Sequence, residues 1–132
     1  MQTESEKSLK STQQAFEYFT NGLENGNWQD FIDMLTDDFT FWFPMVKFHG
    51  LNTGKERAKE FLEYVYEAFQ PGIKLTSLDS ITSNEKTVIF EFRDEGNLFG
   101  QLYKNRVAVA FDVRDDKIYG YREYFGSDGK SY

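Results

Sequence analysis

Apolar residues in the first quarter of the chain recur at the spacing of a helix. They lie seven, three and four positions apart, and they are Leu9, Phe16, Phe19 and Leu23. This period predicts an amphipathic helix from about residue 6 to Glu24, where Asn25-Gly26-Asn27 breaks the pattern. The polar residues 1–5 that precede it are expected to fray, since no apolar side chain holds them to a core.

Asn27 is a suitable N-cap for a second, short helix. The apolar face of this helix is formed by Trp28, Phe31, Ile32 and Leu35. Strand-forming aromatics then follow, because Phe39–Phe43 reads FTFWF. We predict a short strand there that stops at Pro44, since proline cannot donate a ladder hydrogen bond.

A loop over residues 45–52 leads to a third helix. Thr53 and Glu56 have the spacing of a capping box at its start. Its apolar stripe consists of Ala58, Phe61, Leu62, Val65 and Phe69. Pro71-Gly72 ends the helix, because neither residue continues one.

The second half of the chain is predicted to form four strands with tight connections. The strands span 73–82, 87–95, 101–114 and 117–126. Turns at 83–86 and Asp115-Asp116 join two of the pairs, while Gly96 and Gly100 bracket the third hairpin. Helices followed by antiparallel hairpins are typical of an α+β fold with the helices on one face of a curved sheet. We expect one domain over residues 1–132.

Alternation along the last two strands separates a pocket face from an outer face. The predicted pocket face carries Asn105, Val107, Val109, Phe111, Tyr119, Tyr121, Glu123 and Phe125. The outer face carries Lys104, Arg106, Ala108, Ala110, Asp112, Ile118, Gly120, Arg122 and Tyr124. Glu123 would therefore lie among aromatic rings, where burial raises the pKa of a carboxyl group toward neutrality. Its alternative role is an ion pair with a nearby Arg or Lys.

The strand near 87–93 also alternates, with Val88, Phe90 and Phe92 as its apolar set. Glu91 and Arg93 then face outward, as a surface pair of little energetic weight. A bulge near Glu95-Gly96 would reverse this assignment, because one extra residue flips the side chains that follow it. Both orientations stay open at this point.

Composition narrows the classes of function. Aromatic residues make up 18% of the chain, so rings are expected to line the core. The net charge of −7 disfavours nucleic-acid binding. There is no cysteine, and the single histidine, His49, has no evident metal-binding partners, so we expect no metal site. The sequence contains neither an apolar leader nor a run of about 20 apolar residues, so we expect a cytoplasmic protein without membrane contact.

Several short motifs carry a resemblance to a known family. They are Glu95-Gly96, Gly100, Tyr103-Lys104-Asn105-Arg106, residues 111–118 and Arg122-Glu123-Tyr124-Phe125. Over residues 12–128 the chain resembles the SnoaL-like branch of the NTF2-like superfamily, and within it the ketosteroid isomerase-related proteins. The resemblance implies a cystatin-like cone in which three N-terminal helices pack on a curved, mixed, mainly antiparallel sheet around an apolar pocket. It also implies a homodimer formed through the outer sheet face.

The superfamily's ketosteroid isomerases use a helix tyrosine, an aspartate before a proline on the first strand, and a protonated aspartate on a later strand. Tyr18 matches the helix tyrosine. The base position falls on Phe43 and the donor position at or next to Val107, and neither side chain can exchange a proton. The chain is therefore not expected to be a ketosteroid isomerase.

The superfamily's limonene epoxide hydrolases use an Asp-Arg-Asp triad around a water molecule. Glu123 stands at the second acid of that triad. The other two members have only a loose, inverted counterpart in residues 91–93, and Phe41 and Phe43 replace the water-holding tyrosine and asparagine. Hydrolysis by that mechanism thus lacks its water-holding residues here.

Our leading hypothesis is a pocket that binds a small apolar molecule. The expected lining is Tyr18, Trp28, Phe41, Phe43, Tyr66, Asn105, Val107, Tyr121 and Phe125, with Glu123 as the catalytic group. The chemistry would be a cofactor-free isomerisation, cyclisation, hydration or hydrolysis. The alternative is a non-catalytic dimeric interaction module whose cone is filled by rings. In that case small outer-face residues, namely Ala108, Ala110 and Gly120, would admit a second sheet.

Overall fold

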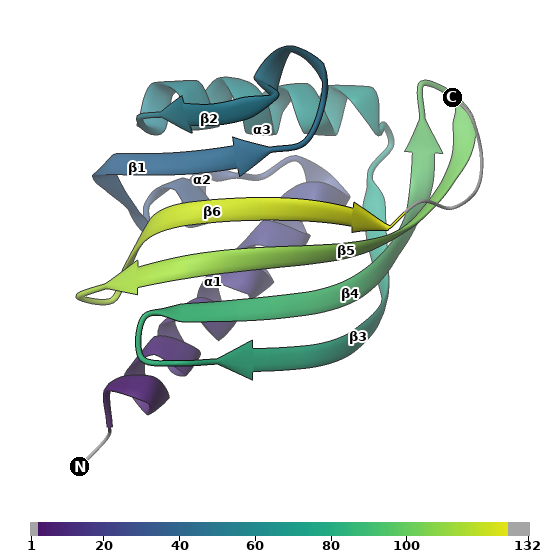
Figure 1. Cartoon of the computed structure of the whole chain (residues 1–132). Coiled ribbons are helices and arrows are strands. Elements are labelled where there is room, and N and C mark those ends of the chain that lie inside the picture. The colour runs from purple at the N-terminus through teal and green to yellow at the C-terminus, as the bar shows by residue number, and fades with distance from the viewer. Residues whose placement is uncertain (1–2, 127–132) are drawn as a thin grey trace.

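The computed structural model describes residues 3–126 as three helices and a 3-10 turn against one six-stranded sheet (Figure 1). In chain order the elements are α1 (Glu4–Asn25), α2 (Gln29–Ile32), β1 (Leu35–Phe43), η1 (Val46–Phe48), β2 (Gly50–Thr53), α3 (Lys55–Ala68), β3 (Ile73–Ser83), β4 (Thr87–Leu98), β5 (Gln101–Arg114) and β6 (Lys117–Gly126). The strand order is β2-β1-β6-β5-β4-β3, in which β1 and β6 are parallel and every other pair is antiparallel. The predicted α+β class with a curved mixed sheet is confirmed.

Helix α1 crosses behind the sheet and supplies one wall of the core (Figure 1). It starts earlier than predicted, because the Thr3 side chain accepts a hydrogen bond from the Glu6 backbone N–H at 3.1 Å. It ends at Gly26, whose φ of 80° suits a glycine C-cap. The predicted apolar face is buried, and the Phe16 ring stacks on Phe90 at 4.3 Å.

Two predicted helix caps do not form. Helix α2 is a single turn with Trp28 at its N-cap, and Asn27 does not cap it. Thr53 pairs with Thr40 as the last residue of β2, so this segment is a strand where a loop and a helix cap were predicted. Gly54 then becomes the N-cap of α3, and its N–H donates to the Phe39 carbonyl at 2.7 Å.

The β5–β6 hairpin turns where predicted, but a bulge changes one side-chain assignment. Val113 pairs with Ile118 and Asp112 with Gly120, which leaves Tyr119 as the extra residue. Ile118 therefore points into the core with 0% exposure, and Tyr119 lies outside (Arg114 approaches its ring at 4.9 Å). The predicted inward position of Tyr119 and outward position of Ile118 were wrong, because one inserted residue reverses the alternation.

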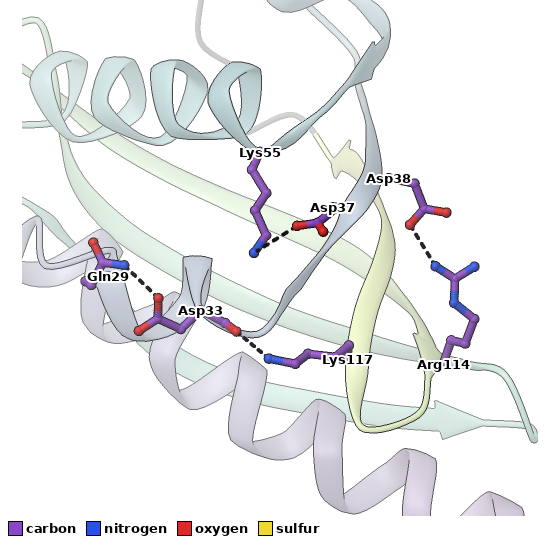
Figure 2. Close-up of polar contacts among 7 residues, drawn as sticks. All are labelled: Gln29, Asp33, Asp37, Asp38, Lys55, Arg114 and Lys117. Carbon is purple, nitrogen blue, oxygen red and sulfur yellow. Dashed lines mark hydrogen bonds and ion pairs between the residues drawn. The ribbon is translucent and has the colours of Figure 1, made fainter.

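Polar contacts join α2, β1, α3 and the β5–β6 hairpin away from the cavity (Figure 2). The Lys117 ammonium donates to the Asp33 carbonyl at 2.7 Å, and the Arg114 guanidinium donates to Asp38 at 2.7 Å. Lys55 lies 3.8 Å from Asp37. Water screens these exposed charges, so the contacts orient the elements while the aromatic core supplies most of the stability.

Candidate functional site

A cavity of about 570 Å³ lies between α1, α3 and the concave face of the sheet. That volume falls within the roughly 300–1,000 Å³ of small-molecule sites. The predicted residues that line it are Trp28, Phe43, Asn105, Val107, Tyr121, Glu123 and Phe125. They come from segments far apart in the chain, which the fold brings to one space.

Aromatic rings form most of the cavity wall and hold one another in place. Phe43 meets Phe61 edge-on at 4.7 Å and Phe125 at 5.6 Å. Edge-to-face arrangements of this kind are favourable contacts between aromatic rings. Trp28 lies against Gly22 of α1, where a Cβ atom would fall 2.2 Å from the indole ring. Gly22 therefore makes room for one wall of the cavity.

Two carboxyl groups enter the cavity from different strands, Glu123 from β6 and Asp94 from β4. The Tyr121 hydroxyl donates a hydrogen bond to the Glu123 carboxylate. Asp94 is 6% exposed, and its Oδ1 has no hydrogen-bond partner in the described part of the chain. Beside them, the Asn105 amide donates to the Tyr103 hydroxyl at 2.7 Å.

Burial shifts the protonation of this cluster. Removal from water raises the pKa of Glu123 to about 8; the neighbouring charge of Asp94 adds to the rise, and the Tyr121 hydrogen bond opposes it. Burial likewise raises the pKa of Asp94 to about 7. The pKa of Tyr121 is raised well above its usual value, mainly by burial, so its hydroxyl remains a donor. Both acids therefore titrate near neutral pH, well above the range of an exposed carboxyl group.

Comparison with known proteins now identifies the family. The sequence pattern of the SnoaL-like domain matches residues 16–121, which is most of the chain. The protein belongs to the SnoaL-like family. It is 67% identical to an NTF2-like protein from Anabaena variabilis, with a TM-score of 0.93 over 100% of this chain and 98% of that one. No curated protein sequence matches it significantly.

More distant solved structures share the fold of this SnoaL-like protein. A protein of unknown function with a cystatin-like fold from Xanthomonas campestris has a TM-score of 0.75 at 14% identity, over 89% of this chain and 91% of that one. An LEH-like epoxide hydrolase from M. tuberculosis has a TM-score of 0.69 at 22% identity, over 94% of this chain and 86% of that one. At such identities the likeness establishes the architecture alone.

Three residues predicted to line the pocket of this SnoaL-like protein lie elsewhere. Tyr18 is at the edge of the buried face of α1, where the next residue, Phe19, occupies the wall position instead. Phe41 is 1% exposed and stacks on Phe61 at 4.8 Å, within the packed core. The Tyr66 ring packs against Gly26 at the end of α1. These three predictions were wrong because neither a matching position in a related family nor the periodicity of a strand or helix says which side chains cover a residue.

Sequence reasoning missed Asp94, although the signal was available. Asp94 continues the inward alternation of Val88, Phe90 and Phe92 by one further step. The pairing of β4 with β5 is continuous from Thr87 to Leu98, so no bulge interrupts that alternation. For the same reason Glu91 and Arg93 face outward, as first assigned, and the Arg93 side chain pairs with Asp79 at 2.9 Å.

Two further features complete the description of residues 3–126. Within that range, no group of three or more His, Asp or Glu side chains is arranged to hold a metal ion. None of the helices described there has the length and apolar character needed to cross a bilayer.

Proposed function

We propose that this SnoaL-like protein binds a small, mainly apolar molecule in the cone and transforms it by cofactor-free proton transfer. Glu123 is the group that gives or takes the proton. One observation carries the proposal: a carboxyl group whose pKa is about 8 faces a ring-walled cavity of about 570 Å³. Perturbed carboxyl groups in clefts are typical of catalytic sites.

The two carboxyl groups suit complementary roles. A catalytic acid or base is most effective when its pKa lies near the working pH. Glu123 and Asp94 both titrate near neutral pH, so each can take a proton when ionised and give one when protonated. Two titratable groups in one site can divide the duties of acid and base between them. Isomerisation, cyclisation and hydration all need such a pair.

Two features weigh against the other roles considered for the cone. A filled cone was the basis of the interaction-module alternative, and the open cavity contradicts that part of it. Glu123 accepts a hydrogen bond from the Tyr121 hydroxyl, and no Arg or Lys within residues 3–126 forms an ion pair with it. A purely structural ion pair at Glu123 is thereby disfavoured.

A generic proton-transfer probe tests the proposal without a known substrate. We suggest the base-catalysed ring opening of 5-nitrobenzisoxazole, a small aromatic molecule whose product absorbs visible light. The wild-type protein should accelerate it, with a rate that rises with pH up to about 8. Glu123→Gln should lower the rate by at least about tenfold and shift the remaining profile toward pH 7, where Asp94 titrates.

The matched control is Glu91→Gln, which removes a carboxylate from the outer face of the same sheet. Its rate should equal that of the wild type. Circular dichroism and thermal melting establish that each variant is folded. Equal rates for wild type and Glu123→Gln would remove Glu123 from the mechanism, and failure of apolar probes to bind would remove the proposed function altogether.

A further inference from the structure

We propose that the natural ligand is a lipophilic amine, bound as its ammonium ion at the carboxyl groups of Asp94 and Glu123 with its apolar body against the aromatic wall. This inference rests on the proposed function, because it names the ligand class of the same cavity. Its structural basis is a pair of acids inside the cone that form no ion pair with any described residue.

An imbalance of charge appears when the titratable lining residues are taken together. They are Tyr64 from α3, Asp94 from β4, Tyr103 and Lys104 from β5, and Tyr121 and Glu123 from β6. Among these described lining residues the one cation, Lys104, is exposed and lies 3.8 Å from Glu95. No ion pair between described residues involves Asp94 or Glu123. The part of the cavity lining that lies within residues 3–126 therefore presents two acids without a partner cation.

Asp94 carries the clearest structural sign that a cation binds in the cavity. Its Oδ1 is buried without a hydrogen-bond partner among residues 3–126, which is unusual for a polar side-chain atom. An unpaired buried carboxylate is costly, and folding has already removed this one from water. A ligand ammonium would supply both the opposite charge and the missing donor. A carboxylate ligand would instead be repelled, and a neutral ligand would supply no charge.

The aromatic wall favours the same ligand. An ammonium group is attracted to the faces of Trp, Tyr and Phe rings, more strongly where water is excluded. Trp28, Phe92 and Tyr121 line the cavity that contains the two acids. The net charge of −7 adds a long-range attraction that raises the local concentration of cations. Ion pairing with the two acids, contact with the aromatic rings and the negative net charge thus all favour a cationic ligand.

The protonation of Asp94 and Glu123 should make the affinity for an amine depend on pH. An ammonium ion favours the ionised carboxylates, so its binding should release protons at pH values below the raised pKa values of Asp94 and Glu123. Amine affinity should therefore increase from about pH 6 to about pH 8.5, a range in which an alkylamine stays charged. A neutral alcohol that accepts a hydrogen bond from the protonated acids should show the opposite trend.

The test is calorimetric titration of the full chain with three probes that share a naphthalene ring. They are 2-(1-naphthyl)ethylamine, 2-(1-naphthyl)ethanol and the carboxylate naphthalene-1-acetate. At about pH 8.5 we expect the amine to bind about tenfold or more tightly than the alcohol, and the acetate to bind most weakly. Asp94→Asn and Glu123→Gln should each reduce the preference for the amine to about threefold or less, while alcohol binding persists.

The outcomes separate this inference from the function on which it rests. Alcohol binding as tight as amine binding, at both about pH 6 and about pH 8.5, would overturn the amine assignment and leave the apolar site intact. Absence of binding by all three probes would overturn the site itself. Glu91→Gln is the control for surface charge, so an equal loss of amine preference there would also overturn the assignment. The two cavity substitutions lie on different strands, so if one variant does not fold, the other still tests the assignment.

Discussion

At the scale of single residues, the environment decides what a carboxyl group can do. Glu91 and Glu123 have the same side chain, but Glu91 faces solvent, whereas Glu123 faces the cavity and accepts a hydrogen bond from the Tyr121 hydroxyl. Burial opposes ionisation and raises the pKa of Glu123 and Asp94. The raised pKa values suit these two groups to proton transfer near neutral pH. They also mean that ionisation of either group should destabilise the fold.

This linkage predicts that stability decreases with pH. The pKa values of Asp94 and Glu123 rise from 3.8 and 4.5 to about 7 and about 8 on folding. Between these limits the folded protein binds more protons than the unfolded chain, so the free energy of unfolding falls as pH rises. Urea unfolding between about pH 5 and pH 9 should show a decrease on the order of 2 kcal/mol from Asp94.

Asp94→Asn provides the comparison, because an amide of the same shape cannot ionise. Its free energy of unfolding should depend less on pH than that of the wild type, and Glu123→Gln should behave likewise. Glu91→Gln should leave the wild-type dependence unchanged. A wild-type stability that increases over this pH range would show that neither acid is buried as described.

At the scale of elements, α1 shapes the cavity through a residue that helix propensity disfavours. Glycine in a helix interior is less favourable than alanine by about 1 kcal/mol. Gly22 nevertheless stands in α1, because a Cβ there would fall 2.2–2.6 Å from ring atoms of Trp28. The close approach of Trp28 to the helix backbone keeps the indole ring at the wall instead of in the cavity.

Gly22→Ala therefore should destabilise the protein despite the better helix former. The added methyl must push Trp28 away, and overpacking of this kind typically costs about 1–3 kcal/mol. Binding of the naphthalene probes should weaken as well, because a displaced Trp28 occupies cavity space. Urea unfolding and calorimetry measure the two effects.

The matched control is Asn21→Ala on the preceding, exposed position of α1. It adds helix propensity without a clash and should be neutral or slightly stabilising. If Gly22→Ala stabilised the protein to a similar degree, the packing of Trp28 against α1 would not be tight.

At the scale of the whole molecule, the outer face of the sheet carries a partly exposed aromatic pair. Trp42 stacks on Tyr124 at 5.6 Å, and Tyr124 is 49% exposed. Ala108 pairs with Tyr124 across β5 and β6. Two of the small residues expected to admit a second sheet are otherwise engaged, since Ala110 is buried and the Asp112 side chain fills the space beside Gly120. Ala108 remains the small position on this surface.

We propose that a second copy of the chain covers this outer face. The stacked Trp42–Tyr124 pair offers an aromatic contact for the same patch of a partner, as a twofold interface requires, and Ala108 lies between Tyr124 and Glu91 beside it. Light scattering at micromolar concentration should give the mass of a dimer. Ala108→Glu should give a monomer, because it places an unpaired charge at the centre of the contact.

Gln14→Glu, on the exposed side of α1, is the control and should remain dimeric. A wild-type monomer at micromolar concentration would contradict the dimer. A dimeric Ala108→Glu protein would place the interface elsewhere.

The sequence by itself determined the class of fold and most strand faces of this protein. Hydrophobic period distinguishes helix from strand locally, so α1, α3 and the four long strands were predictable. Alternation also placed Glu123, Val107 and Asn105 toward the cavity, because the two faces of a strand follow directly from its geometry. Extending the same alternation to Asp94 would have found the second acid.

Only the tertiary structure decided which inward residues border open space. Phe41 and Phe43 share one face of β1, but Phe41 is enclosed by the core whereas Phe43 lines the cavity. The bulge at Tyr119 and the recruitment of Thr53 into β2 likewise depend on strand pairing. Periodicity reports the direction of a side chain, but cavities, bulges and caps depend on partners distant in sequence, whose packing no local pattern encodes.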